Sequence, residues 1–188
     1  MRCFLALPLA APALAEAQHL QARLREGVEA VRWARPETLH VTVHFFGQLT
    51  DAESERALAA VTPLAARTPS IALEFDRLGS FPPGERARVL WLGASHPNAA
   101  LTRFAVACRE ALQLAGFAVE ARAFRLHCTL GRPRLPWPQT ARTAWTRALN
   151  DTVAPMRCRA DAMVLYESRP GPGGAVYDVR ATLPLASA

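Results

Sequence analysis

The chain has 188 residues, about half of them apolar, and a formal net charge of +6. These values fit one globular domain or two small lobes that share a core. All 22 basic residues are arginine, which excludes chemistry that depends on lysine, such as ligation through a lysyl adenylate, phosphate binding by a P-loop lysine and Schiff-base catalysis. The basic balance is compatible with an RNA partner, although a GC-rich genome would produce the same composition.

The N-terminal residues allow two interpretations. Residues 2–8 form an apolar run that fits a buried first strand, and residues 11–27 follow as an amphipathic helix that ends near Gly27. The same run, with the small residues at 13–15, also resembles a secretory signal and its cleavage site. We favour the strand and helix because the amphipathic pattern continues past that cleavage point. The rest of the sequence has no apolar run of membrane-spanning length, and we expect no membrane association.

Periodicity, capping and turn signals predict the other elements. Thr50 and Glu53 form a capping-box pattern that opens a helix to about Arg67, which Pro63 could kink or shorten. In chain order, the remaining predicted elements are an extended segment at 29–36, strands at 39–47, 71–78 and 88–93, a helix from Ser95 or Pro97 to Leu114, a strand at 124–131, a short helix at 139–149, and strands at 162–167 and 175–185, with loops at 79–84, 132–138 and 170–174.

The four cysteines are widely spaced and form no C-x-x-C motif. Neither a zinc knuckle nor a redox motif is therefore indicated. We expect free, mostly buried thiols in a reducing compartment, which favours the cytoplasm.

Two of the predicted strands carry the same polar pair, a histidine followed two residues later by a threonine. The pairs are His40 with Thr42 and His127 with Thr129. Because side chains alternate across a strand, each pair shares one face, while the residue between them points toward the core. Each segment thus presents an imidazole and a hydroxyl over an apolar floor. A simpler interpretation, two half-buried histidines that bond to neighbouring hydroxyls, is left open by the pattern alone.

The two pairs suggest acid–base chemistry at phosphorus. One imidazole can take a proton from the nucleophile while the other gives a proton to the leaving oxygen, and the threonine hydroxyls with Arg132 can hold phosphate oxygens. In-line displacement needs the base and acid on opposite sides of the phosphate, which two facing strands would provide. No acidic cluster accompanies the histidines, so we expect neither metal nor cofactor. In a regular strand His44 would share the face of His40, which leaves a His40–Thr42–His44 metal site as an alternative.

The order of the elements is informative about the fold. Each half of the chain carries a strand, a long helix and a His-x-Thr strand, and the two motif histidines lie nearly half the chain apart. This predicts a pseudo-symmetric, two-lobed α+β fold in which both motif strands face one cleft.

Further segments match a known family together with the two motifs. They are residues 2–7, 31–33, 36–42, 45–47, 78–82, 88–91, 124–132 and 165–168, and Tyr177. With these segments, essentially the whole chain resembles the 2H (two-histidine) phosphoesterase superfamily, and within it the bacterial RNA 2′,3′-cyclic phosphodiesterases of the LigT/ThpR-like group, first named 2′-5′ RNA ligases. The departures from the family pattern are small, namely His44, Cys128 and Gly131, and none of them removes a catalytic group.

The resemblance implies an α+β, bilobal and pseudo-symmetric fold, with antiparallel sheets lining a central cleft and helices outside. Residues 1–188 would form a single domain of two intertwined lobes that retains its first strand. The implied activity is hydrolysis of a 2′,3′-cyclic phosphate at an RNA end to a 2′-phosphate, without a metal. The same site could instead perform reversible 2′-5′ RNA ligation, or the protein could be a non-catalytic module that binds RNA ends.

The resemblance also assigns residues and partners. His40 would be the acid that protonates the leaving O3′ and His127 the base on water, while Thr42, Thr129 and Arg132 would bind phosphate. The implied partner is RNA with a 2′,3′-cyclic phosphate terminus, such as tRNA fragments, or small cyclic nucleotides. A monomer in the cytoplasm is the default expectation, since the sequence does not determine the oligomeric state. Candidates for stacking on the terminal base are Trp33, Phe4 and Phe46.

Overall fold

The computed structural model describes residues 1–172 and 174–187. The strands of this part of the chain are β1 (Arg2–Pro8), β2 (Val31–Trp33), β3 (His40–Gln48), β4 (Ile71–Phe75), β5 (Arg77–Phe81), β6 (Val89–Gly93), β7 (His127–Pro133), β8 (Met156–Ala160), β9 (Ala162–Gly171) and β10 (Gly174–Pro184). Its helices are α1 (Ala13–Gly27), α2 (Asp51–Arg67), α3 (Ala99–Leu114) and α4 (Gln139–Asn150), with short 3-10 helices η1 (Pro36–Thr38) and η2 (Gly84–Arg86).

One twisted antiparallel sheet runs through the molecule. Its strand order is β10-β9-β1-β3-β7-β6-β5, and β2 pairs with β7 beside this path. β4 and β8 form a separate two-stranded ribbon. The two His-x-Thr strands, β3 and β7, are therefore neighbours in the middle of the sheet.

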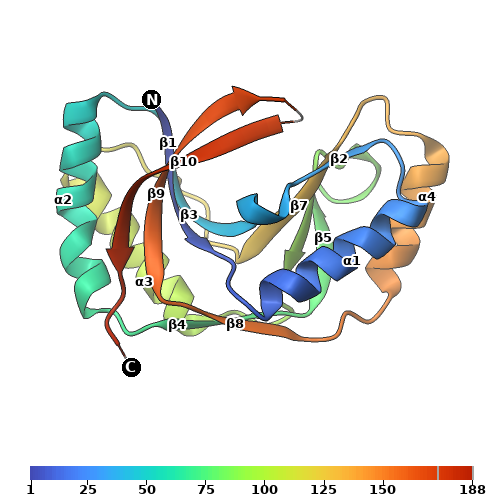
Figure 1. The fold of residues 1–188 in the computed structure, drawn as a ribbon, viewed down its shortest axis with the longest axis horizontal. Helices are drawn as coiled ribbons and strands as arrows, with labels where there is room; N and C mark the ends of the chain where they lie inside the picture. Colours follow the sequence, from blue (N-terminus) through green and yellow to red (C-terminus); the bar gives the residue numbers. More distant parts are fainter. Residues whose placement is uncertain (173, 188) are drawn as a thin grey trace.

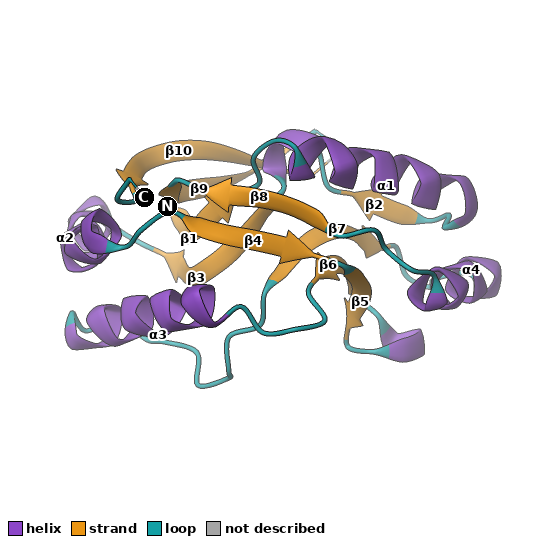
Figure 2. Ribbon diagram, turned by 90° about the horizontal axis from the view of Figure 1, so that it is seen from below, coloured by secondary structure: helices purple, strands orange, loops and turns teal. Residues whose placement is uncertain are grey.

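Helices flank the sheet at both ends and define two lobes. α2 packs with α3 at one end, and α1 packs with α4 at the other (Figure 1). Figure 2 shows the β4–β8 ribbon running between these two ends. The helix pairs do not follow chain order, because α1 packs beside α4 although α2 and α3 come between them in the sequence. The chain therefore passes back and forth between the lobes. The predicted α+β, two-lobed arrangement with outer helices is confirmed.

The first strand is among the most buried segments of the chain. β1 lies between β3 and β9, and its residues from Cys3 to Leu7 are all buried. A strand that is covered on both faces reads as a continuous apolar run rather than an alternating one, which explains the sequence pattern. The strand predicted at residues 2–8 is confirmed.

The helix predicted from its capping box is confirmed as α2. The Thr50 hydroxyl accepts a hydrogen bond from the Glu53 backbone N–H at 3.2 Å, and the Glu53 carboxylate accepts one from the Thr50 N–H at 2.8 Å. Pro63 does not shorten the helix, which continues to Arg67. The proline lies on the exposed side, so its ring does not disturb the buried face.

Other boundaries differ from the prediction. Residues 71–78 form two strands rather than one, because the chain turns at Asp76, whose carboxylate accepts a hydrogen bond from the Ser95 N–H at 2.6 Å. The second motif strand begins at His127 rather than at residue 124, and β8 was not predicted at all. The predicted loop at 170–174 is partly strand, since β9 continues to Gly171, and its residue 173 lies outside the described residues.

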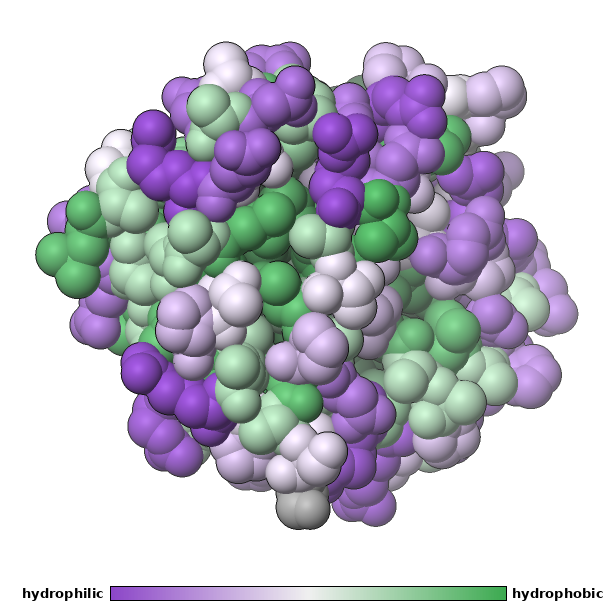
Figure 3. Space-filling model, turned by 60° about the vertical axis from the view of Figure 1, so that its left-hand side comes forward, coloured by the Kyte–Doolittle hydropathy of each residue, from purple (hydrophilic) through white to green (hydrophobic). Residues whose placement is uncertain are grey.

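The outer surface is mixed in hydropathy. Figure 3 brings the α2 end forward and shows hydrophilic groups interspersed with smaller hydrophobic areas. Across residues 1–172 and 174–187, no helix combines the length and apolar character that crossing a membrane requires.

Candidate active site

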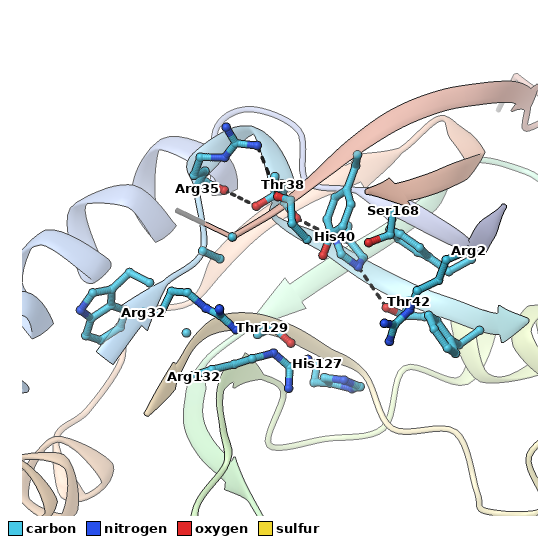
Figure 4. A pocket seen from close by; sticks show the side chains of 18 residues that line it. Arg2, Arg32, Arg35, Thr38, His40, Thr42, His127, Thr129, Arg132 and Ser168 are labelled. Carbon is cyan, nitrogen blue, oxygen red and sulfur yellow. Dashed lines mark hydrogen bonds between the residues drawn. The ribbon is translucent and has the colours of Figure 1, made fainter. Parts of the chain in front are cut away.

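A single residue pair joins the two motif strands. Val41 of β3 lies directly opposite Cys128 of β7, and both side chains are fully buried. Since neighbouring residues of a strand point to opposite faces, the residues flanking this pair turn away from the core together. The four motif side chains line one pocket of about 500 Å³ (Figure 4): His40, Thr42, His127 and Thr129. The structure thus brings together all four residues that the sequence singled out.

The motif strands lie side by side in one sheet, rather than as two opposed strands, and both line one pocket. In an antiparallel pair centred on Val41 and Cys128, His40 lies on the side of Thr129, and Thr42 lies on the side of His127. The imidazoles therefore take opposite corners of a four-residue patch and the hydroxyls take the other two. A phosphate bound over the centre of this patch has one imidazole on each side.

The ring of His40 is fixed at both nitrogens. Its Nδ1 lies 2.6 Å from the carbonyl oxygen of Thr38, and its Nε2 lies 3.0 Å from the hydroxyl of Thr42. A carbonyl can only accept, so Nδ1 carries a hydrogen and donates it. In the neutral ring Nε2 is then the acceptor, toward which the Thr42 hydroxyl donates. The Thr38 hydroxyl in turn donates to the Arg35 carbonyl at 2.6 Å, which ties η1 to the site.

His127 repeats this arrangement. Its Nδ1 lies 2.8 Å from the carbonyl oxygen of Arg125, again two residues before the histidine. The same argument makes Nδ1 the donor and leaves Nε2 free to exchange a proton. Both motifs therefore set the same tautomer through the same local bond, and in each neutral ring Nε2 is the nitrogen without a hydrogen.

Aromatic rings surround His40 and keep water away from it. The ring centroid of Phe4 lies 4.9 Å from that of His40, and Tyr177 meets the imidazole edge-on at 5.5 Å. The pKa of His40 is lowered from 6.5 to about 4, chiefly by burial and in smaller part by the charge of His127, while the Thr38 carbonyl acts in the opposite direction. His40 is consequently neutral in the free pocket at neutral pH.

The pKa of His127 is also lowered, chiefly by burial. The Arg125 carbonyl works in the opposite direction, while the charges of Arg125 and Arg132 add to the lowering. The edge of the ring packs against Phe81, with centroids 5.2 Å apart. Both imidazoles thus prefer the neutral form in the free pocket, and an anion bound beside either ring would raise the pKa of that ring.

Arginines supply the positive charge of the pocket. Arg132, predicted from the sequence, lines it together with Arg2, Arg32 and Arg35, which the sequence did not single out. Arg35 is held in place, since its guanidinium forms an ion pair with Glu37 at 3.3 Å and donates to the Ala175 carbonyl at 3.3 Å. Arg2 comes from β1 and Arg32 from β2, outside both motif strands. The pairing of β1 with β3 and of β2 with β7 places them here.

His44 does not share the face of His40, contrary to the expectation for a regular strand. In the β1–β3 pair, Leu5 lies opposite His44 and Ala6 opposite Thr42, so Val43 is an extra residue. This bulge reverses the alternation after Thr42. His44 is buried at 4% exposure, its ring packs on Phe46 at 4.5 Å, and the alternative metal site of His40, Thr42 and His44 is wrong.

The same bulge changes which aromatic residue reaches the pocket. Phe45, rather than the expected Phe46, lines the pocket and is 47% exposed, with the Arg2 guanidinium 5.1 Å from its ring centroid. Of the other stacking candidates, Trp33 and Phe4 do line the pocket. Strand alternation alone could not have identified Phe45, because the bulge depends on the partner strand.

Comparison with known proteins places the chain in a family. A family model for the 2′-5′ RNA ligase superfamily matches residues 33–172. The chain belongs to this superfamily. Both His-x-Thr motifs fall within the matched region, and the resemblance seen in the sequence is confirmed.

Similar members of the superfamily include proteins from archaea and bacteria. The RNA 2′,3′-cyclic phosphodiesterase of Archaeoglobus fulgidus is 32% identical over 118 residues. These residues cover 61% of this chain and 63% of that protein, so the chain spans less than two thirds of the relative's length. The enzyme of the same name from Thermotoga maritima is 24% identical over 180 residues, covering 95% of this chain and 92% of that protein. Among solved structures, E. coli LigT complexed with 3′-AMP superposes with a TM-score of 0.78 at 23% identity, covering 98% of this chain and 97% of that chain. These comparisons confirm the 2H phosphoesterase type of fold.

Proposed function

We propose that this protein hydrolyses 2′,3′-cyclic phosphates at RNA ends to 2′-phosphates, with His40 and His127 as its acid–base pair and without a metal ion. The names of its relatives support the substrate class. The observation that carries the proposal is the fixed orientation of two imidazoles in one pocket, each with Nδ1 bonded to the carbonyl two residues earlier. Binding alone would not require two rings held in the same tautomer.

The proposed step is an in-line displacement by water. His127 Nε2 takes a proton from water as the water oxygen bonds to phosphorus. The bond from phosphorus to O3′ breaks, and His40 Nε2 gives its proton to O3′, which leaves a 2′-phosphate. Thr42, Thr129 and Arg132 hold the non-bridging oxygens and offset their charge. Proton exchange with solvent then restores both rings.

The acid role requires a protonated His40 in the complex, although the ring is neutral in the free pocket. A phosphodiester anion beside Nε2 favours the imidazolium and raises the pKa. The Nδ1–H bond to the Thr38 carbonyl suits the charged ring as well as the neutral one. We therefore expect substrate binding to be coupled to proton uptake at His40.

Phosphorus NMR tests the proposal directly. A short RNA ending in a 2′,3′-cyclic phosphate is mixed with the protein in EDTA, in parallel with His40→Ala and His127→Ala. Conversion to a 2′-phosphate by the wild type alone is the expected result. A 3′-phosphate product would overturn the assignment of O3′ as leaving group, and conversion that required added metal would overturn the metal-free mechanism. Binding without any conversion would favour the non-catalytic RNA-end module.

Ligation is the second candidate function, favoured by the description of the matched superfamily. The 5′-hydroxyl of another RNA takes the place of water, attacks the same phosphorus and displaces the same O3′, which forms a 2′-5′ linkage. The same two histidines serve both reactions. Incubation of the cyclic end with an excess of a labelled 5′-hydroxyl RNA, followed by denaturing electrophoresis, separates a joined product from a hydrolysed one.

We further propose that the protein works as a single-domain monomer in the cytoplasm. All four cysteines are free and buried, which fits a reducing compartment. Small cyclic nucleotides and tRNA fragments with a cyclic end are both proposed substrates, since each carries the group that the pocket accepts.

A further inference from the structure

A second hollow continues from the catalytic pocket. It has a volume of about 880 Å³ and shares Arg2, Arg32 and Arg132 with the pocket, while Arg134 and Arg169 line only the second hollow. We call this hollow, with its five arginines, the arginine groove. Among the described residues that line it, none is acidic. Positive charge therefore extends well beyond the space that one cyclic phosphate needs.

Two of these arginines are placed against each other. Arg32 of β2 lies directly opposite Arg132 of β7 in the antiparallel pair. Like charges in directly opposed positions destabilise a strand pair. Both side chains are exposed, and within residues 1–172 and 174–187 neither forms an ion pair with a carboxylate. An anion bound between them would relieve the repulsion.

The remaining arginines differ in how free they are to bind a ligand. Arg169 is already paired with Asp178. Arg134 has its backbone fixed, since its N–H donates to the Ala30 carbonyl at 2.8 Å, but its side chain is exposed and has no ion pair in the described part of the chain. Arg134 lines the groove and not the catalytic pocket, so it can report on the groove alone.

Phosphate is the anion that this arrangement fits. Guanidinium forks bind phosphate oxygens in pairs, and several arginines along one groove follow a strand with one charge per nucleotide. With a terminal cyclic phosphate in the catalytic pocket, the next phosphate of an RNA lies on the 5′ side of the terminal ribose. The adjoining groove is open to receive it.

We propose that the arginine groove binds the phosphodiester next to the cyclic end, so that the enzyme prefers oligonucleotides over mononucleotides. This inference rests on the proposed function, because the cyclic end must occupy the catalytic pocket. An arginine-rich chain can form basic patches by composition alone. The lack of lining acids and the opposed Arg32–Arg132 pair are what distinguish this groove from such a patch.

The test compares two substrates that differ only in length. One is uridine 2′,3′-cyclic phosphate, and the other is a tetranucleotide that ends in the same cyclic phosphate. For the wild type we expect a higher kcat/KM on the tetranucleotide. Arg134→Gln should reduce the ratio of the two kcat/KM values about five- to tenfold, the effect of one lost charged hydrogen-bonding contact, with the mononucleotide rate unchanged. Its slope of log kcat/KM against log salt on the tetranucleotide should become shallower by about 0.7.

Arg103→Gln is the matched control. It removes one exposed positive charge from α3, away from the lining of the pocket and of the groove, and the ratio should stay at the wild-type value. The inference is overturned if the wild type shows no preference for the tetranucleotide, if Arg134→Gln keeps the ratio, or if Arg103→Gln lowers it equally.

A binding measurement separates failure of the groove from failure of the proposed function. If the wild type cleaves neither substrate, the proposed function fails, and the fluorescence anisotropy of a labelled tetranucleotide still tests the groove. Weaker binding by Arg134→Gln than by Arg103→Gln supports the groove, whereas equal binding overturns it. In a separate thermal unfolding experiment without ligand, Arg32→Gln should raise the melting temperature, because it removes the repulsion with Arg132. A lowered melting temperature would contradict the repulsion on which the groove is argued.

Discussion

The burial of His40 should make the stability of the protein depend on pH in a defined window. The pKa is 6.5 for the ordinary group and about 4 in the folded pocket. Between these values the unfolded chain binds a proton at this residue and the folded chain does not, so acid favours unfolding. Above pH 6.5 the ring is neutral in both states and the stability from this group is fully present. It is lost progressively as the pH falls to about 4.

The size of the effect follows from the width of that window. Each pH unit corresponds to about 1.4 kcal/mol, so the interval from 6.5 to about 4 reduces the free energy of unfolding by about 3 kcal/mol. Urea unfolding followed by circular dichroism, at several pH values in this range, measures it. His40→Gln has no titrating group here, and its stability should fall by about 3 kcal/mol less than that of the wild type across the window. The control is His96→Gln, which replaces an exposed histidine; its free energy of unfolding should change with pH as that of the wild type does. If the free energies of His40→Gln and the wild type changed in parallel with pH, the burial of His40 would not be the cause.

Other predictions concern catalysis and packing. His40→Ala and His127→Ala should each lower kcat about 10²- to 10⁴-fold in the cyclic-phosphate assay, with little change in melting temperature. A substrate with sulfur in place of O3′ needs no acid, so it should restore the rate of His40→Ala but not of His127→Ala, and the reverse pattern would exchange the two roles. Gly79→Ala should reduce the free energy of unfolding by about 1–3 kcal/mol, because the new Cβ would lie 2.1 Å from the Trp91 ring. Denaturant titration measures this change. An unchanged denaturation midpoint would contradict the close packing of Trp91 on Gly79. His44→Leu should be neutral or raise the unfolding free energy by about 1 kcal/mol, because it removes a buried Nε2 that has no hydrogen-bond partner among residues 1–172 and 174–187. A large loss of stability in the same titration would contradict this expectation.

The sequence predicted what local periodicity determines. His40 and Thr42 share a face because they are two residues apart, and the same holds for His127 and Thr129. The capping box of α2 is likewise a local pattern, and it set the start of that helix correctly.

What the sequence could not predict depends on partner strands. The bulge at Val43 arises from the register of β3 against β1, and it decides that Phe45 reaches the pocket while His44 is buried. The opposition of Arg32 and Arg132 likewise comes from the pairing of β2 with β7. The residues of one strand do not determine either register, because the same strand can pair with its neighbour in more than one register.

The central position of β1 has a consequence for the synthesis of the protein. The ribosome makes β1 long before β9, yet the two strands are neighbours in the sheet. Until β9 emerges, the nascent chain carries an apolar strand with an unpaired edge, which is the kind of segment that aggregates and that chaperones bind. The ring of His40 packs against Phe4 of β1 and Tyr177 of β10. The pocket around His40 therefore forms only after β10 has left the ribosome.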